Sequence, residues 1–246
     1  MAMINAANTL GLPLSTVCAL VTGASRGIGR AIAQRLASLG ASVAICGRDR
    51  KALEDAVKSL KETGVPVFSK VTDVTKASEI AALVTETEAA LGPIAILVNN
   101  AGIGLFGPAQ EQSEADWDRV LDTNLKSIFL FSKAVVPSMI RQGKGDIINI
   151  SSLAGKNTFP GGGIYCASKW GVMGLTGCMA EDLRQHGIRV SAVCPGSVAT
   201  EFSSRTPKDP AKTLIAEDVA HAVEAIVTQR AGSFLSEIHL RPLRKP

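Results

Sequence analysis

The stretch TGASRGIG, residues 22–29, decides how this sequence is expected to fold. It follows a continuously apolar run at residues 19–21, and apolar residues at helical spacing come after it. Glycines permit a tight turn, and the start of the next helix offers free N–H groups and a positive dipole end to a pyrophosphate. An ordinary strand-to-helix turn can look the same. Because strand, loop, helix and a second strand occur in order here, the stretch favours nucleotide binding.

The alternation of short β-rich runs and helical runs continues to about residue 195. We expect strands at Val17–Thr22, Ser42–Cys46, Val65–Lys70, Ile94–Asn99, Asp146–Ile150, Val190–Cys194 and Phe234–Leu240. We expect helices at Gly27–Leu39, Arg50–Thr63, Lys76–Leu91, Glu114–Met139, Tyr165–His186 and Ile215–Val227. Strands that alternate with helices indicate an α/β fold, a doubly wound parallel sheet with helices on both faces.

The domain organisation is expected to be simple. No Pro- or Ser-rich linker divides the 246 residues, so we expect one domain at residues 15–246. Residues 1–14 are mildly apolar and contain no Lys or Arg. Because a secretory signal begins with basic residues and has a longer apolar centre, we interpret this segment as a flexible N-terminal extension.

Composition excludes several classes of protein. Apolar residues make up 46% and charged residues 20%, as in globular proteins that bury a sizeable core. No run reaches the ~18 apolar residues of a membrane span. The net charge of +4 is small and aromatic residues are only 4%, so we expect neither a membrane nor a nucleic acid as a partner.

Cysteine and histidine residues follow no metal-binding or disulfide pattern. The five cysteines show no CxxC spacing, and the three histidines lie far apart. We therefore expect no metal site and no disulfide framework. Because free thiols suit a reducing compartment, we expect a cytoplasmic location.

The end of the second predicted strand indicates which cofactor the Gly-rich loop binds. NAD sites usually place an acid there for the ribose hydroxyls, whereas this chain has Gly47 followed by Arg48. Arg26 lies in the loop on the same side, and two guanidinium groups can hold a 2′-phosphate. These residues favour NADP(H). In the alternative, Arg48 is a solvated cation and Asp49 takes the acid's role, two positions late.

Tyr165 and Lys169 are candidates for proton transfer. They are four residues apart at the start of a predicted helix, so both side chains lie on one face. A nearby ammonium favours the phenolate, so we expect the pKa of Tyr165 to fall from about 10 toward neutrality. Such a tyrosine can exchange a proton with a carbinol oxygen. The spacing is common by chance, and the pair alone is weak evidence.

Three further polar residues are candidates. Ser151 and Ser152 end the fifth predicted strand, where open α/β sheets bind ligands, and a hydroxyl there could hold the substrate oxygen. The alternative is an N-cap or turn role, which fits Ser151. Asn124 lies inside a long helical pattern, which it disfavours unless it holds a kink or a water.

Together the motifs resemble those of the classical short-chain dehydrogenase/reductase family. The matching motifs, in the family's order, are residues 22–29, Asp73-Val74, Asn99-Asn100-Ala101-Gly102, Asn124, Ser152, Tyr165-x-x-x-Lys169 and Pro195-Gly196. The gap of 13 residues from Ser152 to Tyr165 is also the family's usual spacing. The resemblance covers about residues 17–200, and within the family the chain is most similar to 3-oxoacyl-(acyl carrier protein) reductases.

The resemblance implies a Rossmann-type fold with about seven parallel strands in a homo-oligomer, a tetramer or a dimer. It implies that Tyr165 is the general acid/base and that Lys169 holds the nicotinamide ribose and lowers the pKa of Tyr165. Ser152 would orient the carbonyl group, and Asn124 would keep a water in a proton relay to Lys169.

The expected cofactor contacts combine this resemblance with the loop residues above. Asp73 and Val74 would contact the adenine ring, and Asn100 the adjacent ribose. Val198 and Thr200 would contact the nicotinamide carboxamide. The full set is Gly23, Ser25, Arg26, Ile28, Gly29, Arg48, Asp73, Val74, Asn100, Ala101, Gly102, Tyr165, Lys169, Pro195, Gly196, Val198 and Thr200.

Departures from the resemblance concern the substrate. Carrier-protein reductases tend to have Arg at the position of His186 and a Gly-Gly ending, whereas residues 234–246 read FLSEIHLRPLRKP. Arg141 and Lys144 could still meet an acidic carrier protein, although a solvated loop is the alternative. Segment 201–212, which closes over substrate in the family, is polar here, so we expect an open or mobile pocket. Candidate wall residues are Phe106, Phe159, Ile164 and Phe202.

We therefore expect an NADPH-dependent oxidoreductase that reduces a ketone to a secondary alcohol. The leading substrate is a 3-oxoacyl thioester on a carrier protein, and the alternatives are another small ketone, a sugar or a pterin. A non-catalytic NADP-binding regulator is the rival from another class, and it would not require Tyr165 and Lys169.

Overall fold

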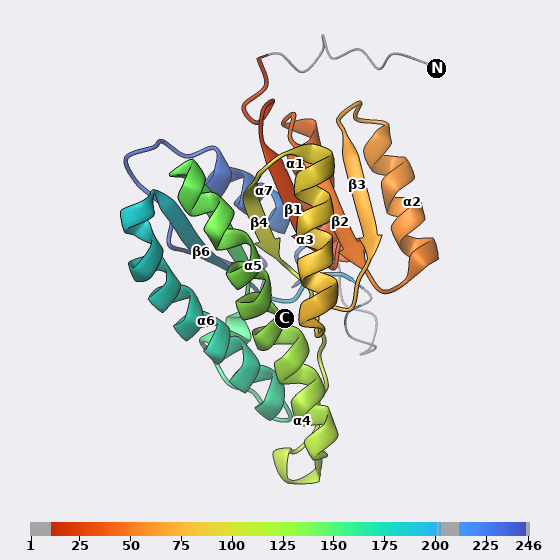
Figure 1. Ribbon diagram of the computed structural model, residues 1–246. Coiled ribbons are helices and arrows are strands. Elements are labelled where there is room, and N and C mark those ends of the chain that lie inside the picture. Colours follow the sequence, from red (N-terminus) through yellow and green to blue (C-terminus); the bar gives the residue numbers. More distant parts are fainter. Residues whose placement is uncertain (1–10, 201, 203–211, 245–246) are drawn as a thin grey trace.

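Seven parallel strands form one sheet, in the order β3-β2-β1-β4-β5-β6-β7 (Figure 1). The computed structural model describes residues 11–200, 202 and 212–244. The strands are β1 (Cys18–Thr22), β2 (Ser42–Gly47), β3 (Val67–Val71), β4 (Ile94–Asn99), β5 (Gly145–Ile150), β6 (Ile188–Pro195) and β7 (Glu237–Leu240). The predicted doubly wound α/β fold is confirmed, and each strand end lies within three residues of its prediction.

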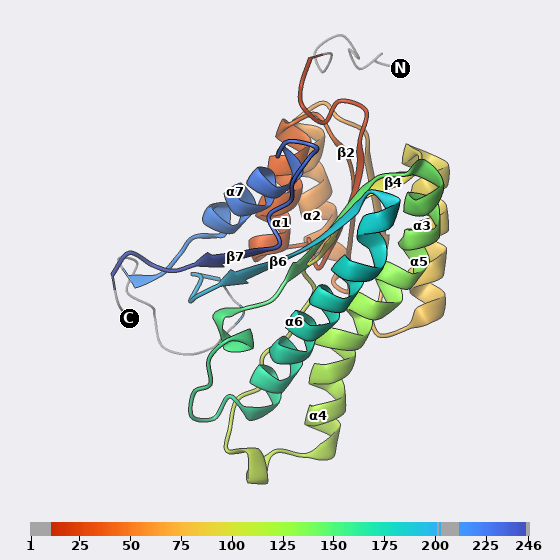
Figure 2. The ribbon, with the colours of Figure 1, turned by 90° about the vertical axis from the view of Figure 1, so that its left-hand side faces the viewer.

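Helices cover both faces of the sheet (Figure 2). One face carries α1 (Gly27–Ser38), α2 (Arg50–Lys61) and α7 (Ala216–Val227). The other carries α3 (Ala77–Leu91), α5 (Ser127–Gln142) and α6 (Gly163–Leu183). None of the helices among the described residues combines the length and the apolar composition that a bilayer crossing requires.

The alternation of side chains along each strand builds two cores. In β1, Val21 belongs to the cluster under α1, and Leu20 belongs to the cluster under α3 and α5, as the period of two requires. Both side chains are fully buried, as are Leu36 of α1 and Phe131 of α5. Each such side chain stabilises the fold by about 1.5–3 kcal/mol.

The direction of winding reverses between β1 and β4, which are neighbours in the sheet. A parallel sheet with such a reversal leaves a crevice at the carboxyl ends of its strands. The Gly-rich loop follows β1 at this point, and Asn100 follows β4. The topology therefore brings the predicted cofactor residues to one edge of the sheet.

The predicted single helix over Glu114–Met139 was wrong. The chain forms α4 (Glu114–Leu121), then a π-helical turn over Asp122–Lys126, and then α5. Asn124 lies in the π turn and is fully buried. Its side chain bonds to the loop after β4 instead of facing solvent, and the π turn interrupts the helix at the residue that disfavours it.

Leu14, the last residue of the expected N-terminal extension, contacts the rest of the fold. Leu14 is buried, and its backbone N–H donates to the carbonyl of Leu39 at the end of α1. Leu14 therefore packs with the body of the protein, although we expected it in a flexible extension. Residues 1–10 of that expected extension lie outside the described residues.

Candidate active site

A cavity of about 1400 Å³ lies at the carboxyl ends of the strands. Every residue of the predicted cofactor set lines it except Gly29, and Ser152 lines it as well. Asn124 does not line the cavity, because its side chain is buried behind the loop after β4. The structure thus brings together residues that are spread over most of the sequence.

The Gly-rich loop is fixed by close backbone contacts that side chains would prevent. Gly23 has a φ of 62°, in the left-handed region. A Cβ atom on Gly29 would lie 2.4 Å from Nδ2 of Asn100 and 2.5 Å from the carbonyl oxygen of Gly23. Gly29 therefore serves the loop by its lack of a side chain, rather than by facing the cavity.

Thr22 joins the loop to the end of β4, a role that the sequence analysis missed. Its hydroxyl oxygen accepts hydrogen bonds from the backbone N–H groups of Asn100 and Ala101, both at 3.0 Å. The Asn100 amide donates to the Thr22 carbonyl at 2.9 Å and to the Gly23 carbonyl at 3.2 Å. The position of Thr22, at the end of a strand and before a Gly-rich turn, was the sequence feature that could have indicated this role.

The end of β2 lines the cavity and leaves little space for a side chain at Gly47. Gly47 is buried, and a Cβ atom on it would lie 3.1 Å from Oγ of Ser25. Arg48 is exposed and lines the cavity. Asp49 accepts a hydrogen bond from the backbone N–H of Ala52 and caps α2. This cap gives Asp49 a structural role, which weakens the alternative that it binds ribose hydroxyls.

Asp73 is held in place beside this end of the cavity. Its carboxylate accepts hydrogen bonds from the backbone N–H and the hydroxyl of Thr75, at 3.0 and 2.8 Å. The Thr75 N–H is the main cause of the lowered pKa of Asp73, and the charges of Lys76 and Arg48 lower it further. Asp73 is therefore a fixed anion close to Arg48.

Tyr165 and Lys169 lie near each other on α6, as predicted. Lys169 is buried, and its ammonium donates to the carbonyl of Ile150 at 2.8 Å. The ammonium lies 5.8 Å from the centre of the Tyr165 ring. Both side chains therefore line the cavity, and Lys169 contacts the last residue of β5.

The predicted fall in the pKa of Tyr165 was wrong. Burial raises the pKa of Tyr165 to about 12, although a hydrogen bond with Ser152 works in the opposite direction. Burial also lowers the pKa of Lys169 to about 8. Desolvation is the largest cause of both shifts because both groups are almost fully enclosed. Tyr165 is therefore a protonated phenol at neutral pH.

The Ser152 hydroxyl caps a short helix and also contacts Tyr165. Its hydroxyl oxygen accepts a hydrogen bond from the backbone N–H of Ala154 at 3.1 Å and caps the short 3₁₀ helix Leu153–Gly155. It also bonds to Tyr165. The capping role expected of Ser151 was wrong, because the Ser151 hydroxyl donates to the carbonyl of Lys169 at 3.3 Å.

Asn124 fixes the loop that follows β4. Its side-chain oxygen accepts from the N–H of Ile103 at 2.8 Å, and its amide donates to the Ile103 carbonyl at 2.9 Å. The same amide donates to the hydroxyl of Ser168 at 3.1 Å, on the turn of α6 beside Lys169. Asn124 therefore connects the cavity loop to the helix that carries Tyr165 and Lys169.

Aromatic side chains surround Tyr165. The ring centroids of Phe106 and Phe202 lie 5.4 and 5.9 Å from that of Tyr165, and Phe159 lies 6.0 Å from Phe106. All three phenylalanines line the cavity, as expected. The prediction for Ile164 was wrong, because it is buried and does not line the cavity. Of segment 201–212, from which we expected an open or mobile pocket, residues 201 and 203–211 lie outside the described residues.

Comparison with known families identifies a relationship over most of the chain. Residues 17–211 match the family described as short chain dehydrogenase. Gluconate 5-dehydrogenase of Gluconobacter oxydans is 40% identical over 196 residues, which cover 80% of this chain and 77% of that protein. The 3-oxoacyl-(acyl carrier protein) reductase FabG of Staphylococcus aureus is 38% identical over 228 residues, which cover 88% of this chain and 92% of that protein.

Solved structures agree with this relationship. A metagenomic short-chain oxidoreductase in complex with NADP has a TM-score of 0.84 and 43% identity, and the match covers 94% of this chain and 100% of that one. An alcohol dehydrogenase from the archaeon Thermococcus sibiricus, complexed with 5-hydroxy-NADP, has a TM-score of 0.87 and 30% identity. That match covers 94% of this chain and 98% of the archaeal chain.

Proposed function

The chain belongs to the short-chain dehydrogenase family, and we propose that it is an NADPH-dependent reductase that converts a ketone to a secondary alcohol. One observation carries this proposal. Ser152, Tyr165 and Lys169 meet in the same cavity that the Gly-rich loop and Arg48 line. A proton donor and a cofactor cradle in one cavity are the two parts that carbonyl reduction needs.

The residues around the end of β2 fit NADP(H). Gly47 supplies no acidic side chain at the position where NAD sites carry one, and a Cβ atom there would crowd Oγ of Ser25. Arg26 and Arg48 line the cavity and can bind a 2′-phosphate by charge-assisted hydrogen bonds. The NADP complexes among the similar solved structures support the same choice. When bound, the cofactor supplies the hydride.

Substitution of Arg48 tests the choice of cofactor. We expect Arg48→Asp to weaken NADPH binding at least tenfold, because a hydrogen bond to a charged group contributes about 1.5–3 kcal/mol. NADH binding should change little. Arg50→Asp is the matched control, because Arg50 lies at the start of α2 and does not line the cavity. An unchanged NADPH affinity, measured by fluorescence titration, would mean that Arg48 takes no part.

We propose that Tyr165 carries out the proton transfer. Its phenol is protonated at neutral pH, so it can donate to a carbonyl oxygen as that oxygen gains charge. The Ser152 hydroxyl can donate a second hydrogen bond to the same oxygen, since it already lies beside Tyr165. The Lys169 ammonium, 5.8 Å from the ring, then stabilises the tyrosinate. Asn124 holds the loop at Ile103 and reaches Ser168, and in the relay that the family resemblance implies it would keep a water that leads to Lys169.

Tyr165→Phe tests whether the chain is an enzyme or a binding protein. We expect the variant to lose at least 10²-fold in turnover, the usual contribution of a general acid. NADPH affinity should stay close to that of the parent, because the substitution removes only the hydroxyl. Equal turnover by parent and variant would contradict the role of Tyr165. A parent that binds NADPH tightly but turns over no carbonyl in a broad panel would favour a regulator.

The proposed substrate class is a 3-oxoacyl thioester, which the reductase of Staphylococcus aureus supports as a relative. Three phenylalanines around Tyr165 form an apolar wall that suits an acyl chain. Gluconate 5-dehydrogenase is an equally similar relative, which keeps a sugar acid or another small ketone as the alternative. NADPH oxidation followed with acetoacetyl thioester, 5-ketogluconate and simple ketones separates these substrates.

We also infer a homo-oligomer and a cytoplasmic location. Exposed aromatic side chains lie on α4, α5 and α6, where Trp117, Phe129 and Trp170 are 47%, 49% and 50% exposed. Large exposed apolar side chains of this kind are typical of protein contacts. All five cysteines are free thiols, which supports a reducing compartment.

A further inference from the structure

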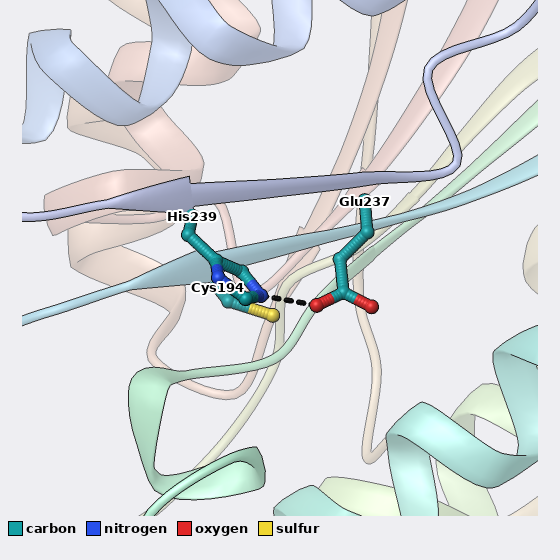
Figure 3. Close-up of side chains that lie close together, drawn as sticks. All are labelled: Cys194, Glu237 and His239. Atoms are coloured by element: carbon teal, nitrogen blue, oxygen red, sulfur yellow. Dashed lines mark hydrogen bonds and ion pairs between the residues drawn. The ribbon is translucent and has the colours of Figure 1, made fainter.

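A thiol, an imidazole and a carboxylate meet where β6 pairs with β7. Cys194 lies directly opposite His239 in the parallel register, and Glu237 is two residues before His239. Because side chains alternate along a strand, all three lie on the same face of the sheet. Figure 3 shows the three side chains pointing toward one another. Their thiol sulfur, carboxylate oxygen and imidazole nitrogen all lie within 4.8 Å of one another.

We propose that Cys194, Glu237 and His239 bind one Zn²⁺ ion at this edge of the sheet. Thiolate, imidazole and carboxylate are the three ligand types that zinc accepts. Calcium and magnesium prefer sites made of oxygen alone, and the carboxylate makes the set less suitable for Cu(I), which prefers soft sulfur ligands. Zinc sites with three protein ligands keep the fourth position for water.

The surroundings hold the ligands in place. Lys156 forms an ion pair with one oxygen of Glu237, at 2.9 Å, and the other oxygen contacts Nε2 of His239. A carboxylate oriented in this way by a partner presents its second oxygen to a metal. Below the cluster, the Cys194 thiol donates to the thioether of Met173 at 3.6 Å. The thiol sulfur therefore lies between α6 and the two side chains of β7.

One of the three proposed zinc ligands is buried, and the other two are partly exposed to solvent. Cys194 is fully buried, whereas the side chains of Glu237 and His239 are 29% and 41% exposed. Burial and the charge of Glu237 raise the pKa of Cys194 to about 11, so the thiol is protonated without metal. Zinc binding would form the Zn–S bond and release this proton to water. The exposed side leaves room for the ion to enter and for the water ligand.

Zinc at this position would join the edge strand to its neighbour. β7 has only four residues and pairs with β6 alone. A ligand that binds only the folded chain stabilises it in proportion to its occupancy. Zinc should therefore raise the melting temperature. The three ligands are not among the residues proposed for carbonyl reduction, although Cys194 lies near Ser151 and Lys169, and the test requires no turnover.

Cobalt substitution tests the site directly in the full-length protein. After dialysis against a chelator, the chain should bind one Co²⁺ with a thiolate-to-cobalt charge-transfer band in the near ultraviolet, and added Zn²⁺ should abolish this band. Cys194→Ser should remove the band. His239→Gln and Glu237→Gln should each weaken zinc binding at least tenfold and remove most of the zinc-dependent rise in melting temperature.

Two control variants separate this site from other ligands of the chain. Cys178 is an exposed free thiol on α6, and His221 is an exposed imidazole on α7. Cys178→Ser and His221→Gln should keep the full band and the full thermal shift. If Cys194→Ser does not fold, the two β7 variants decide the question. A band that survives in those variants, a band lost in Cys178→Ser, or binding of Cu(I) alone would overturn the proposal.

Discussion

Lys169 is a buried ammonium group, and its burial costs the folded state free energy. Burial lowers its pKa from 10.5 to about 8. Since one pKa unit corresponds to ~1.4 kcal/mol, this shift amounts to roughly 3 kcal/mol at pH 7. Between pH 8 and 10.5 the unfolded chain holds a proton that the folded chain has already released, so this cost disappears as the pH rises. The buried charge of Lys169 therefore lowers the free energy of unfolding at neutral pH.

Lys169→Met should remove this dependence of stability on pH. We expect the unfolding free energy of the parent to rise by roughly 3 kcal/mol relative to the variant between pH 8 and 10.5. Urea unfolding of both proteins at several pH values measures this difference. Parallel curves for parent and variant would show that burial does not shift the titration of Lys169.

The same titration should appear in the kinetics of reduction. Tyr165 stays protonated up to about pH 12, whereas Lys169 loses its charge near pH 8. The kcat/KM for ketone reduction, which reports groups of the free enzyme, should therefore be level near neutrality and fall above about pH 8. Lys169→Arg, which keeps its charge, should move this fall to higher pH. A parent profile that stays level to pH 10 would contradict the role of the Lys169 charge.

At the scale of elements, the π turn between α4 and α5 depends on one side chain. Asn124 satisfies both backbone groups of Ile103, at 2.8 and 2.9 Å. Asn124→Ala leaves these groups without their partner, at an expected cost of about 1–3 kcal/mol in unfolding free energy. The melting temperature measures this cost. Asn157→Ala is the control, because the exposed Asn157 makes one bond, to Leu153, and its loss should cost much less.

The sequence predicted elements well where local residues determine them. β4 occupies Ile94–Asn99 as expected, because an apolar run there stands between Gly92-Pro93 and two asparagines. The π turn was not predicted, because the helical pattern continues through it and its cause, Ile103, belongs to a distant loop. β7 begins at Glu237 rather than Phe234, since its extent depends on pairing with β6.

The site residues were also predicted where local motifs identify them and missed where distant contacts decide. The motifs placed Ser152, Tyr165 and Lys169 in one cavity without any knowledge of contacts. The pKa of Tyr165 was predicted in the wrong direction because spacing reports adjacency, whereas burial decides the sign. Cys194 lies next to His239 because of the register between β6 and β7, and this register cannot be predicted from a local sequence pattern.

At the scale of the whole molecule, exposed aromatic residues give the proposed homo-oligomer a direct test. Trp170→Glu and Phe129→Glu place charges on α6 and α5, where apolar side chains would meet a second copy. We expect light scattering to show smaller assemblies for both variants, with unchanged circular dichroism. Val71→Glu on β3 is the control, because this exposed residue lies at the other end of the strand order. An unchanged mass for both aromatic variants would place the contact elsewhere.

The strand order also has a consequence for the chain as it leaves the ribosome. β1 is central in the sheet, yet one of its two neighbours, β4, ends only at Asn99. At ordinary rates of synthesis, β4 is complete roughly 4–15 s after β1. During this interval an apolar strand keeps one open side, where a nascent chain is most exposed to wrong partners. Slow translation of residues 72–99 should therefore increase aggregation of the newly made chain.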